Sequence, residues 1–250
     1  MTTTVTSPWI RRYHPAPTAA VRLVCLPHAG GSASYFHPVS ARFSPQTEVI
    51  ALQYPGRQDR RHERTITDMH TLADQVTAEL LALDPKPTVF FGHSMGAVLG
   101  FETIKRLEDG GATGPYTLIA SGRRGPSTHR DEQVHDQTDD FLIKEIKKLN
   151  GTSSTLLADD EILRMALPSL RGDYEAIETY TCPADRKINA PITVLTGDND
   201  PKTTVDEATV WQHHTTATYR IKVFPGGHFF LQEHPTDINN EIVKEVLSLR

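Results

Sequence analysis

A serine between two glycines, in the motif G-H-S-M-G at 92–96, is the strongest candidate for chemistry in this chain. The motif follows an apolar run at 88–92 and precedes an apolar helical pattern that begins near Ala97. In that context, G-x-S-x-G predicts a sharp strand-to-helix turn that projects the serine hydroxyl above a sheet. The glycines let strand and helix approach closely, and the first helical turn directs free backbone N–H groups towards a reacting carbonyl. We therefore predict that Ser94 is a nucleophile.

A serine hydroxyl is a weak nucleophile until a base removes its proton, so the chain must also supply a histidine and an acid that orients it. His228 follows an apolar run and a Gly-Gly turn, and among the twelve histidines it alone combines these features. Loops at the carboxyl ends of parallel strands share one edge of a sheet, so His228 can meet Ser94 there. We predict His228 as the general base. We expect His93 to point away from the site, although it adjoins Ser94.

Two carboxylates compete for the orienting role, because Asp198 and Asp200 both follow the apolar run at 192–196. Asp200 precedes Pro201, which restricts the chain direction at that point. Asp198 directly follows a glycine turn, where an aspartate commonly bonds the amides of its own loop. We take Asp200 as the acid that holds the histidine tautomer and keep Asp198 as the alternative.

A glycine-rich loop, P-H-A-G-G-S at 27–32, follows the first apolar run and can bring backbone N–H groups close to a ligand. An oxyanion hole needs two such donors, and the residue after the nucleophile, here Met95, supplies one. For the other we predict Ala29, with His28 and Gly30 as rivals. The loop lacks the G-x-G-x-x-G pattern and a Lys-Ser/Thr ending, and the chain has no H-E-x-x-H motif, so we expect no nucleotide, cofactor or metal site.

Short apolar runs and amphipathic patterns alternate along the chain. Runs typical of buried strands occupy 21–27, 47–52, 88–92, 116–120, 192–196 and 219–224. Helical patterns occupy 69–83, 97–108 and 238–249. Such alternation predicts an α/β fold with a mostly parallel central sheet flanked by helices. We expect a single domain over residues 1–250.

One stretch breaks this alternation. Between Gly125 and Pro183 the sequence carries helical patterns and no strand pattern. A helical insertion between two strands of an open sheet can cover the carboxyl edge, where such sheets bind ligands. We predict a helical lid at 126–182. The alternative is a helical pair that only decorates the surface.

The composition excludes several classes of function. The chain has 250 residues and a formal charge of −5, which argues against a general nucleic-acid binder. No apolar run approaches the length of a membrane span, and the N-terminus lacks the pattern of a secretory signal. The two cysteines, Cys25 and Cys182, have no metal-binding or C-x-x-C spacing and are expected to be reduced thiols. We expect a cytoplasmic monomer with neither nucleic acid nor a membrane as partner.

Several motifs occur in the same order in a known family. They are LPHAGGSASYF at 26–36, QYPGRQDRR at 53–61, FFGHSMGAVLGFE at 90–102, LPSLRGDYEAIETY at 167–180, TGDNDP at 196–201 and FPGGHFFL at 224–231. The chain resembles type II thioesterases, the stand-alone editing partners of polyketide synthases and non-ribosomal peptide synthetases, over nearly its whole length. The resemblance implies an α/β-hydrolase fold and a catalytic triad of Ser94, Asp200 and His228. It also implies that Ala29 and Met95 form the oxyanion hole.

The resemblance further implies an activity, the hydrolysis of aberrant or stalled acyl groups from the phosphopantetheine arm of acyl or peptidyl carrier proteins, without a cofactor of its own. The sequence departs from the family at Asn199, where related proteins often carry another acid, and this leaves Asp200 as the triad acid. A triad also serves esters and amides, so the thioester specificity rests on the resemblance. The alternatives are an esterase or lipase for free small molecules, an acyl-carrier thioesterase of fatty-acid synthesis, and an inert binding module.

Basic residues gather in two places along the chain. They lie in the segment YPGRQDRRHER at 54–64 and directly after the run at 116–120, and they are Arg57, Arg60, Arg61, Arg64, Arg123 and Arg124. Complementary charge speeds the docking of an acidic partner, so one hypothesis is that some of these arginines seat the carrier protein. The alternative is that they are solvated or paired internally, with Asp59 and Glu63 as available partners.

Overall fold

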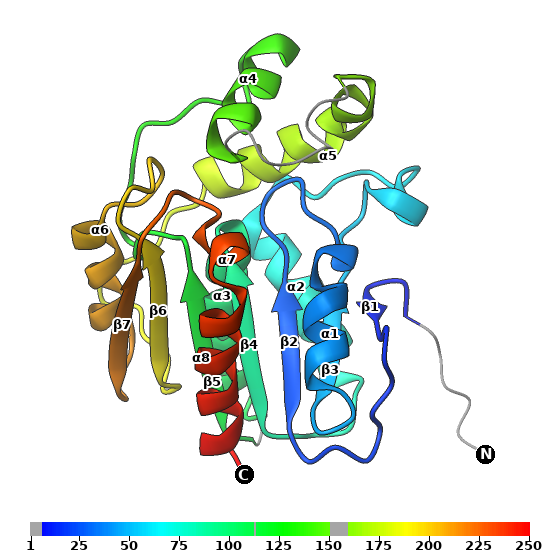
Figure 1. Ribbon diagram of the computed structural model, residues 1–250, viewed down its shortest axis with the longest axis vertical. Coiled ribbons are helices and arrows are strands. Elements are labelled where there is room, and N and C mark those ends of the chain that lie inside the picture. The colour runs from blue at the N-terminus through cyan, green and yellow to red at the C-terminus, as the bar shows by residue number, and fades with distance from the viewer. Residues whose placement is uncertain (1–6, 113, 151–159) are drawn as a thin grey trace.

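The computed structural model describes residues 7–112, 114–150 and 160–250, and within them a seven-stranded sheet forms the centre of the molecule (Figure 1). Its strand order is β1-β3-β2-β4-β5-β6-β7. The strands are β1 (Ile10–Arg11), β2 (Arg22–Leu26), β3 (Glu48–Leu52), β4 (Thr88–His93), β5 (Tyr116–Ser121), β6 (Ile192–Gly197) and β7 (Tyr219–Phe224). β1 pairs antiparallel with β3, and the other neighbours pair in parallel, which confirms the predicted sheet.

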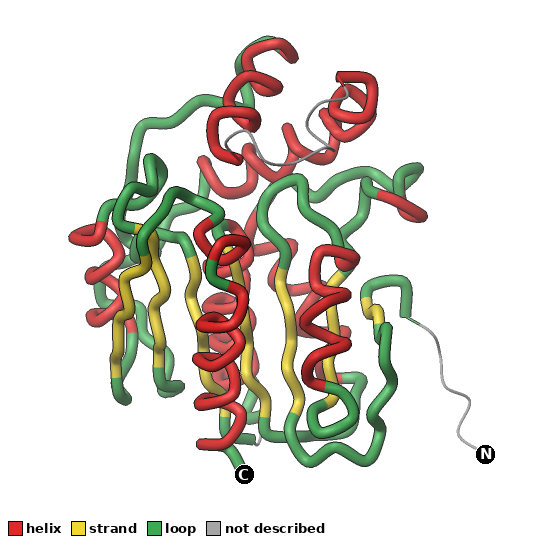
Figure 2. The backbone as a smooth tube through the Cα atoms, viewed as in Figure 1, coloured by secondary structure: helices red, strands yellow, loops and turns green. Residues whose placement is uncertain are grey.

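The central strands form because their apolar side chains are buried on both faces of the sheet. Successive side chains of a strand point to opposite faces, so Phe90 and Phe91 of β4 lie in two different apolar clusters. The carboxyl ends of the strands are in register, with Gly92 of β4 opposite Leu26 of β2 and Ala120 of β5. The loops that carry the predicted site therefore leave one edge of the sheet side by side (Figure 2).

Helices cover both faces of the sheet, and each face has its own apolar cluster. The helices packed on one face are α2 (Met69–Leu81), α3 (Met95–Asp109) and the short α6 (Val205–Thr209). Those packed on the other are α1 (His37–Phe43), α7 (Phe230–Glu233) and α8 (Pro235–Ser248). The two layers bury the sheet and leave its carboxyl edge to be covered by other segments.

Two further helices, α4 (Asp139–Asn150) and α5 (Asp160–Glu178), lie above that carboxyl edge (Figure 1). They share a third apolar cluster, against which Ala29 packs. Both helices fall in the insertion predicted at 126–182, whose described residues contain no strand. Residues 151–159 of the insertion lie outside the described residues. The observed helices match the helical patterns of the sequence, and the role of the insertion as a lid stays a prediction.

Among the described strands and α-helices, the sequence patterns miss four, namely β1, α1, α6 and α7. These are 2, 7, 5 and 4 residues long, too short for a hydrophobic periodicity to show. Two predicted helices also begin earlier than expected, α3 at Met95 and α8 at Pro235. In both cases the first turn carries residues that the apolar pattern does not mark.

Three further observations concern membrane-spanning helices, metal-binding clusters and cysteines in the described part of the chain. None of the described helices is long and apolar enough to cross a membrane. No group of three or more His, Cys, Asp or Glu side chains among the described residues could hold a metal ion. Cys25 and Cys182 are both free, as predicted, and Cys25 is buried.

Candidate active site

Ser94 sits at the turn between β4 and α3 in a backbone conformation that few residues adopt. Its φ is 55° and its ψ is −118°, and its N–H donates a 2.8 Å hydrogen bond to the carbonyl of Ser121. A side chain at Gly92 would come within 2.1 Å of the carbonyl oxygen of Gly96, and one at Gly96 within 2.1 Å of that of Leu26. Such a conformation costs about 1–3 kcal/mol and is typical of functional turns. The glycines on both sides make this strained serine turn possible.

His228 and Asp200 meet at the same edge. The Nδ1 of His228 lies 2.8 Å from Oδ2 of Asp200, and both residues are buried. The other carboxylate oxygen, Oδ1, accepts a 2.8 Å hydrogen bond from the backbone N–H of Lys202. A carboxylate can only accept, so Nδ1 carries the proton, and Nε2 is left as the basic nitrogen. With both oxygens bound, Asp200 is held in the orientation that fixes this tautomer.

The rival carboxylate, Asp198, bonds its own loop and the one beside it. Its Oδ1 accepts hydrogen bonds from the backbone N–H of Gly226 at 2.9 Å and from Nδ2 of Asn199 at 2.7 Å. The bond from Gly226 joins the loop after β6 to the loop after β7, which carries His228. The structure therefore pairs Asp200 with the histidine and gives Asp198 a contact between loops.

The glycine-rich loop after β2 presents fewer free N–H groups than its sequence suggests. Gly30 has a φ of 74°, and its N–H donates a 2.7 Å hydrogen bond to Oδ2 of Asp173 on α5. The N–H of Gly31 donates to the carbonyl of His28 at 2.9 Å. Gly30 is thus already bound and drops out of the rivals for the oxyanion hole, which favours Ala29. Met95, the other candidate donor, is the first residue of α3, where a backbone N–H has no acceptor within its helix.

A family model described as "Thioesterase domain" matches residues 21–246. The chain belongs to this thioesterase family. It is 64% identical to "Probable cadicidin biosynthesis thioesterase" of Streptomyces griseus over 94% of this chain, and it spans 65% of that protein's length. It is 45% identical to "Thioesterase PikA5" of Streptomyces venezuelae over 97% of this chain and 86% of that protein. The solved structure of the type II thioesterase BorB, from the borrelidin biosynthetic cluster, matches with a TM-score of 0.91 and 45% identity over 98% of this chain and 100% of that one.

These similarities confirm two expectations from the sequence. The resemblance to type II thioesterases holds over nearly the whole chain, and the fold is that of an α/β hydrolase. As a member of this family the protein is a thioester hydrolase.

In this thioesterase, His93 lies beside the candidate base, and the expectation that it points away is wrong. Its ring centroid is 5.0 Å from that of His228, and its Nδ1 lies 3.0 Å from Oγ of Ser121. The reason is strand alternation, since His93 shares a face of the sheet with Phe91, and the loop of His228 leads into α7 on that face. Burial lowers the pKa of His93 well below its ordinary value, and the nearby His228 and His28 lower it further.

His93→Gln is expected to make the thioesterase less sensitive to acid. A histidine whose folded-state pKa lies well below its unfolded value of 6.5 binds a proton only after unfolding. Its contribution to stability is therefore present above about pH 6.5 and is lost as the pH falls towards the folded-state pKa. Between about pH 6 and pH 5, the wild-type free energy of unfolding should fall up to about 1.4 kcal/mol per pH unit more steeply than that of the variant. Urea unfolding measures both slopes, and parallel pH profiles would contradict this account of His93.

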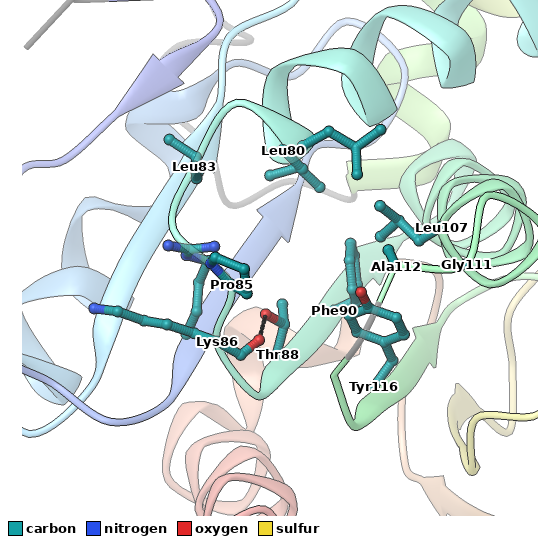
Figure 3. A pocket seen from close by; sticks show the side chains of 12 residues that line it. Leu80, Leu83, Pro85, Lys86, Thr88, Phe90, Leu107, Gly111, Ala112 and Tyr116 are labelled. Atoms are coloured by element: carbon teal, nitrogen blue, oxygen red, sulfur yellow. Dashed lines mark hydrogen bonds between the residues drawn. The ribbon is translucent and has the colours of Figure 1, made fainter.

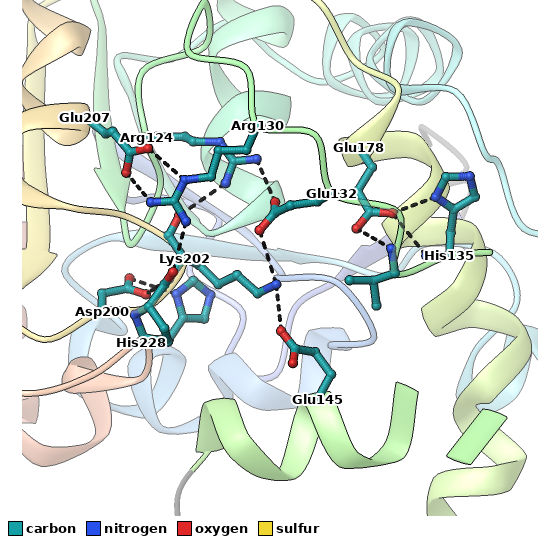
Figure 4. Close-up of polar contacts among 12 residues, drawn as sticks. Arg124, Arg130, Glu132, His135, Glu145, Glu178, Asp200, Lys202, Glu207 and His228 are labelled. Carbon is teal, nitrogen blue, oxygen red and sulfur yellow. Dashed lines mark hydrogen bonds and ion pairs between the residues drawn. The ribbon is translucent and has the colours of Figure 1, made fainter. Parts of the chain in front are cut away.

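The loop that carries Asp200 is tied to the helical insertion through Lys202 (Figure 4). The backbone N–H of Lys202 binds Asp200, and its Nζ lies 3.3 Å from Oε1 of Glu132 and 2.8 Å from Oε1 of Glu145. Glu145 belongs to α4, and Glu132 also accepts a 2.8 Å hydrogen bond from Arg124. Salt screens such partly buried ion pairs less than exposed ones. The network therefore links the acid loop to α4 at the carboxyl edge.

Most of the clustered arginines are internal side chains, which corrects the docking hypothesis. Four of them are buried, namely Arg57, Arg60, Arg123 and Arg124. Arg60 pairs with Glu63, the partner that the sequence offered, and its guanidinium lies 4.5 Å from the centre of the Trp9 ring. Side chains buried in this way cannot seat a carrier protein, so the hypothesis is wrong for these four. Arg61 and Arg64 are exposed, and the hypothesis is restricted to them.

A cavity of about 240 Å³ lies at the other end of the sheet (Figure 3). Its wall includes Thr88 and Tyr116, the first residues of β4 and β5, together with Leu80 and Leu107 from α2 and α3. Ser94 follows the last residue of β4, so the cavity opens at the edge opposite the candidate site. We assign this cavity no part in the reaction.

Proposed function

We propose that this thioesterase hydrolyses aberrant or stalled acyl groups from the phosphopantetheine arm of acyl or peptidyl carrier proteins in polyketide or non-ribosomal peptide biosynthesis. The observation that carries the proposal is the match to the type II thioesterase BorB over nearly the whole of both chains. The name of the Streptomyces griseus relative, which refers to cadicidin biosynthesis, supports a role in a biosynthetic pathway.

In the proposed reaction, Oγ of Ser94 attacks the thioester carbonyl carbon while Nε2 of His228 takes the hydroxyl proton and Asp200 holds the opposite ring nitrogen. The tetrahedral oxyanion accepts hydrogen bonds from the backbone N–H groups of Met95 and Ala29. Collapse of the intermediate breaks the C–S bond, and His228 returns the proton to the leaving pantetheine thiolate. Water activated by the same histidine then attacks the acyl-serine ester, which releases the acid and regenerates Ser94.

The insertion at 126–182 acts in this proposal as a lid within a single domain of residues 1–250. Two contacts support that role: Leu170 of α5 packs against Gly30, and Ala29 packs against the apolar cluster of α4 and α5. An acyl chain on Ser94 would lie at the carboxyl edge that these two helices cover. A lid there would exclude water from the acyl chain and strengthen the electrostatic interactions of the site.

The proposed partners are carrier protein domains, which deliver the acyl group on their own phosphopantetheine. The thioesterase then needs no cofactor of its own, and neither nucleic acid nor a membrane takes part. It would act as a monomer in the cytoplasm, where carrier proteins are loaded. Arg61 and Arg64 are the members of the arginine clusters that could meet an acidic carrier.

A comparison of three substrates tests this function. The same preparation is given an acetyl-carrier protein, a long-chain acyl-carrier protein and a p-nitrophenyl ester, and kcat/KM is measured for each. We expect the acetyl-carrier protein to have the highest value, because the carrier adds binding contacts that the free ester lacks. A preference for the free ester would favour an esterase, and a preference for the long chain would favour a thioesterase of fatty-acid synthesis.

A further inference from the structure

Three sequence motifs that contain no member of the triad meet at one buried carboxylate. Asp173 comes from the motif at 167–180, Arg57 from the motif at 53–61 and Gly30 from the motif at 26–36. Asp173 lies on α5 in the helical insertion, whereas Arg57 and Gly30 belong to the body of the hydrolase. The triad gives no reason for these residues to occur together, so their contacts call for a separate explanation.

The carboxylate of Asp173 binds both Arg57 and the glycine-rich loop at 27–32, which we call the oxyanion loop. Oδ2 accepts hydrogen bonds from the backbone N–H of Gly30 at 2.7 Å and from Nη1 of Arg57 at 2.7 Å. Oδ1 accepts from Nη2 of Arg57 at 2.8 Å, which makes the ion pair bidentate. Nη1 of Arg57 also donates to the carbonyl of Gly31 at 3.0 Å. Asp173 therefore holds the peptide group that joins Ala29 to Gly30, and Arg57 holds the peptide group that follows Gly31.

Burial and close packing restrict the movement of the Asp173 and Arg57 side chains and of the loop that they hold. The side chains of Arg57 and Asp173 are only 6% and 3% exposed, so water does not compete for their hydrogen bonds. A side chain on Gly30 would lie 2.6 Å from Cδ1 of Leu170, one helical turn before Asp173, so only glycine lets α5 approach this closely. Because each peptide group is planar, a bound N–H at Gly30 also fixes the carbonyl of Ala29. The candidate oxyanion donor, the N–H of Ala29, belongs to the preceding peptide group, which joins His28 to Ala29.

We propose that Asp173 is a positioning residue that sets the oxyanion loop for catalysis, so that α5 takes part in the chemistry by holding the donor of Ala29 in place. The inference rests on the proposed function, because it requires Ser94 and the oxyanion hole to act as described there. It assigns the buried ion pair with Arg57 a role in the transition state rather than only in stability. It also means that α5 must be seated on the loop when the oxyanion forms.

Asp173→Asn tests the proposal, because the amide keeps the size of the side chain and loses the charge that binds Arg57. We expect kcat for a small acyl N-acetylcysteamine thioester to fall by about a hundredfold, the lower end of what the loss of one oxyanion donor costs, with KM changed by less than about threefold. Two inhibitors distinguish an effect on the transition state from an effect on substrate binding. A trifluoromethyl ketone that forms a tetrahedral adduct with the serine should bind more weakly by the same factor as kcat, whereas the matching amide should bind as to the wild type.

Glu178→Gln is the matched control. Glu178 is another buried carboxylate of α5, and it accepts hydrogen bonds from the backbone N–H groups of Val134 and His135 at 3.0 and 3.1 Å, away from the oxyanion loop. This variant should lose stability and keep kcat and the affinity for the ketone. An equal loss of kcat in both variants would overturn the proposal, as would unchanged kcat and ketone affinity in Asp173→Asn.

A double variant, Arg57→Met with Asp173→Leu, keeps the test decisive if the single variant folds poorly. Apolar pairs of similar volume often replace a buried ion pair without loss of stability, but leucine cannot accept the N–H of Gly30. We expect a folded protein whose kcat and ketone affinity stay low, and recovery of both would overturn the proposal. If Ser94 and the oxyanion hole did not act as the proposed function requires, the wild type would bind the ketone no better than the amide, which is a different result.

Discussion

Ser94→Ala is expected to lower kcat for an acyl thioester by about a million-fold, because the members of a catalytic triad act as a unit. Removing the hydroxyl leaves His228 without a proton to take and leaves no oxygen to carry the acyl group. The fold should persist, since the N–H of residue 94 still donates to the carbonyl of Ser121. Steady-state rates on the N-acetylcysteamine thioester measure the loss, and thermal unfolding checks the fold.

The control for this variant is Ser34→Ala, which removes an exposed hydroxyl that bonds Ser32 and Gln58. It should keep the wild-type rate within about threefold, because surface changes of this kind alter little. The Ser94→Ala protein should also still bind the acyl-carrier protein. Turnover within about tenfold of the wild type would mean that another group is the nucleophile.

The parallel strands could be predicted from the sequence because buried strands are continuous apolar runs. The run at 192–196 ends one residue before β6 does, and the run at 88–92 ends one residue before β4 does. The antiparallel β1 could not be predicted in this way. It consists of Ile10 and Arg11, and it exists because β3 offers a free edge to pair with. Elements that depend on a distant partner leave no periodic signal in their own residues.

The residues of the candidate site likewise divide into those that local motifs predict and those that depend on distant partners. Ser94 and His228 stand at motif positions fixed by turns, so their place at the carboxyl edge could be predicted from the chain alone. The buried arginines could not, because charged side chains are mostly exposed and a charge pattern does not reveal an internal partner. Asp173 lies inside a motif that the sequence analysis singled out. Its contacts with Gly30 and Arg57 bridge 143 and 116 positions, and no local pattern predicts them.

Asp200→Asn is expected to lower kcat by about ten-thousand-fold through the wrong histidine tautomer. Asparagine would turn its amide N–H towards Nδ1 of His228 or offer an uncharged oxygen in place of the carboxylate. In the first case the ring proton moves to Nε2, which can then no longer accept the proton of Ser94. The imidazolium formed during the reaction would also lose its counter-charge. The loop itself should keep its shape, because an asparagine oxygen can still accept the N–H of Lys202.

Asp198→Asn is the matched comparison, since it makes the same chemical change two residues away in the same loop. An asparagine there can still accept the N–H of Gly226, so the contact between the two loops is retained in part and kcat should fall far less. Both variants are assayed on the same thioester, with thermal unfolding as the check on folding. A large loss for Asp198→Asn with a small one for Asp200→Asn would mean that the hydrogen bond between Asp200 and His228 is not the one that catalysis uses.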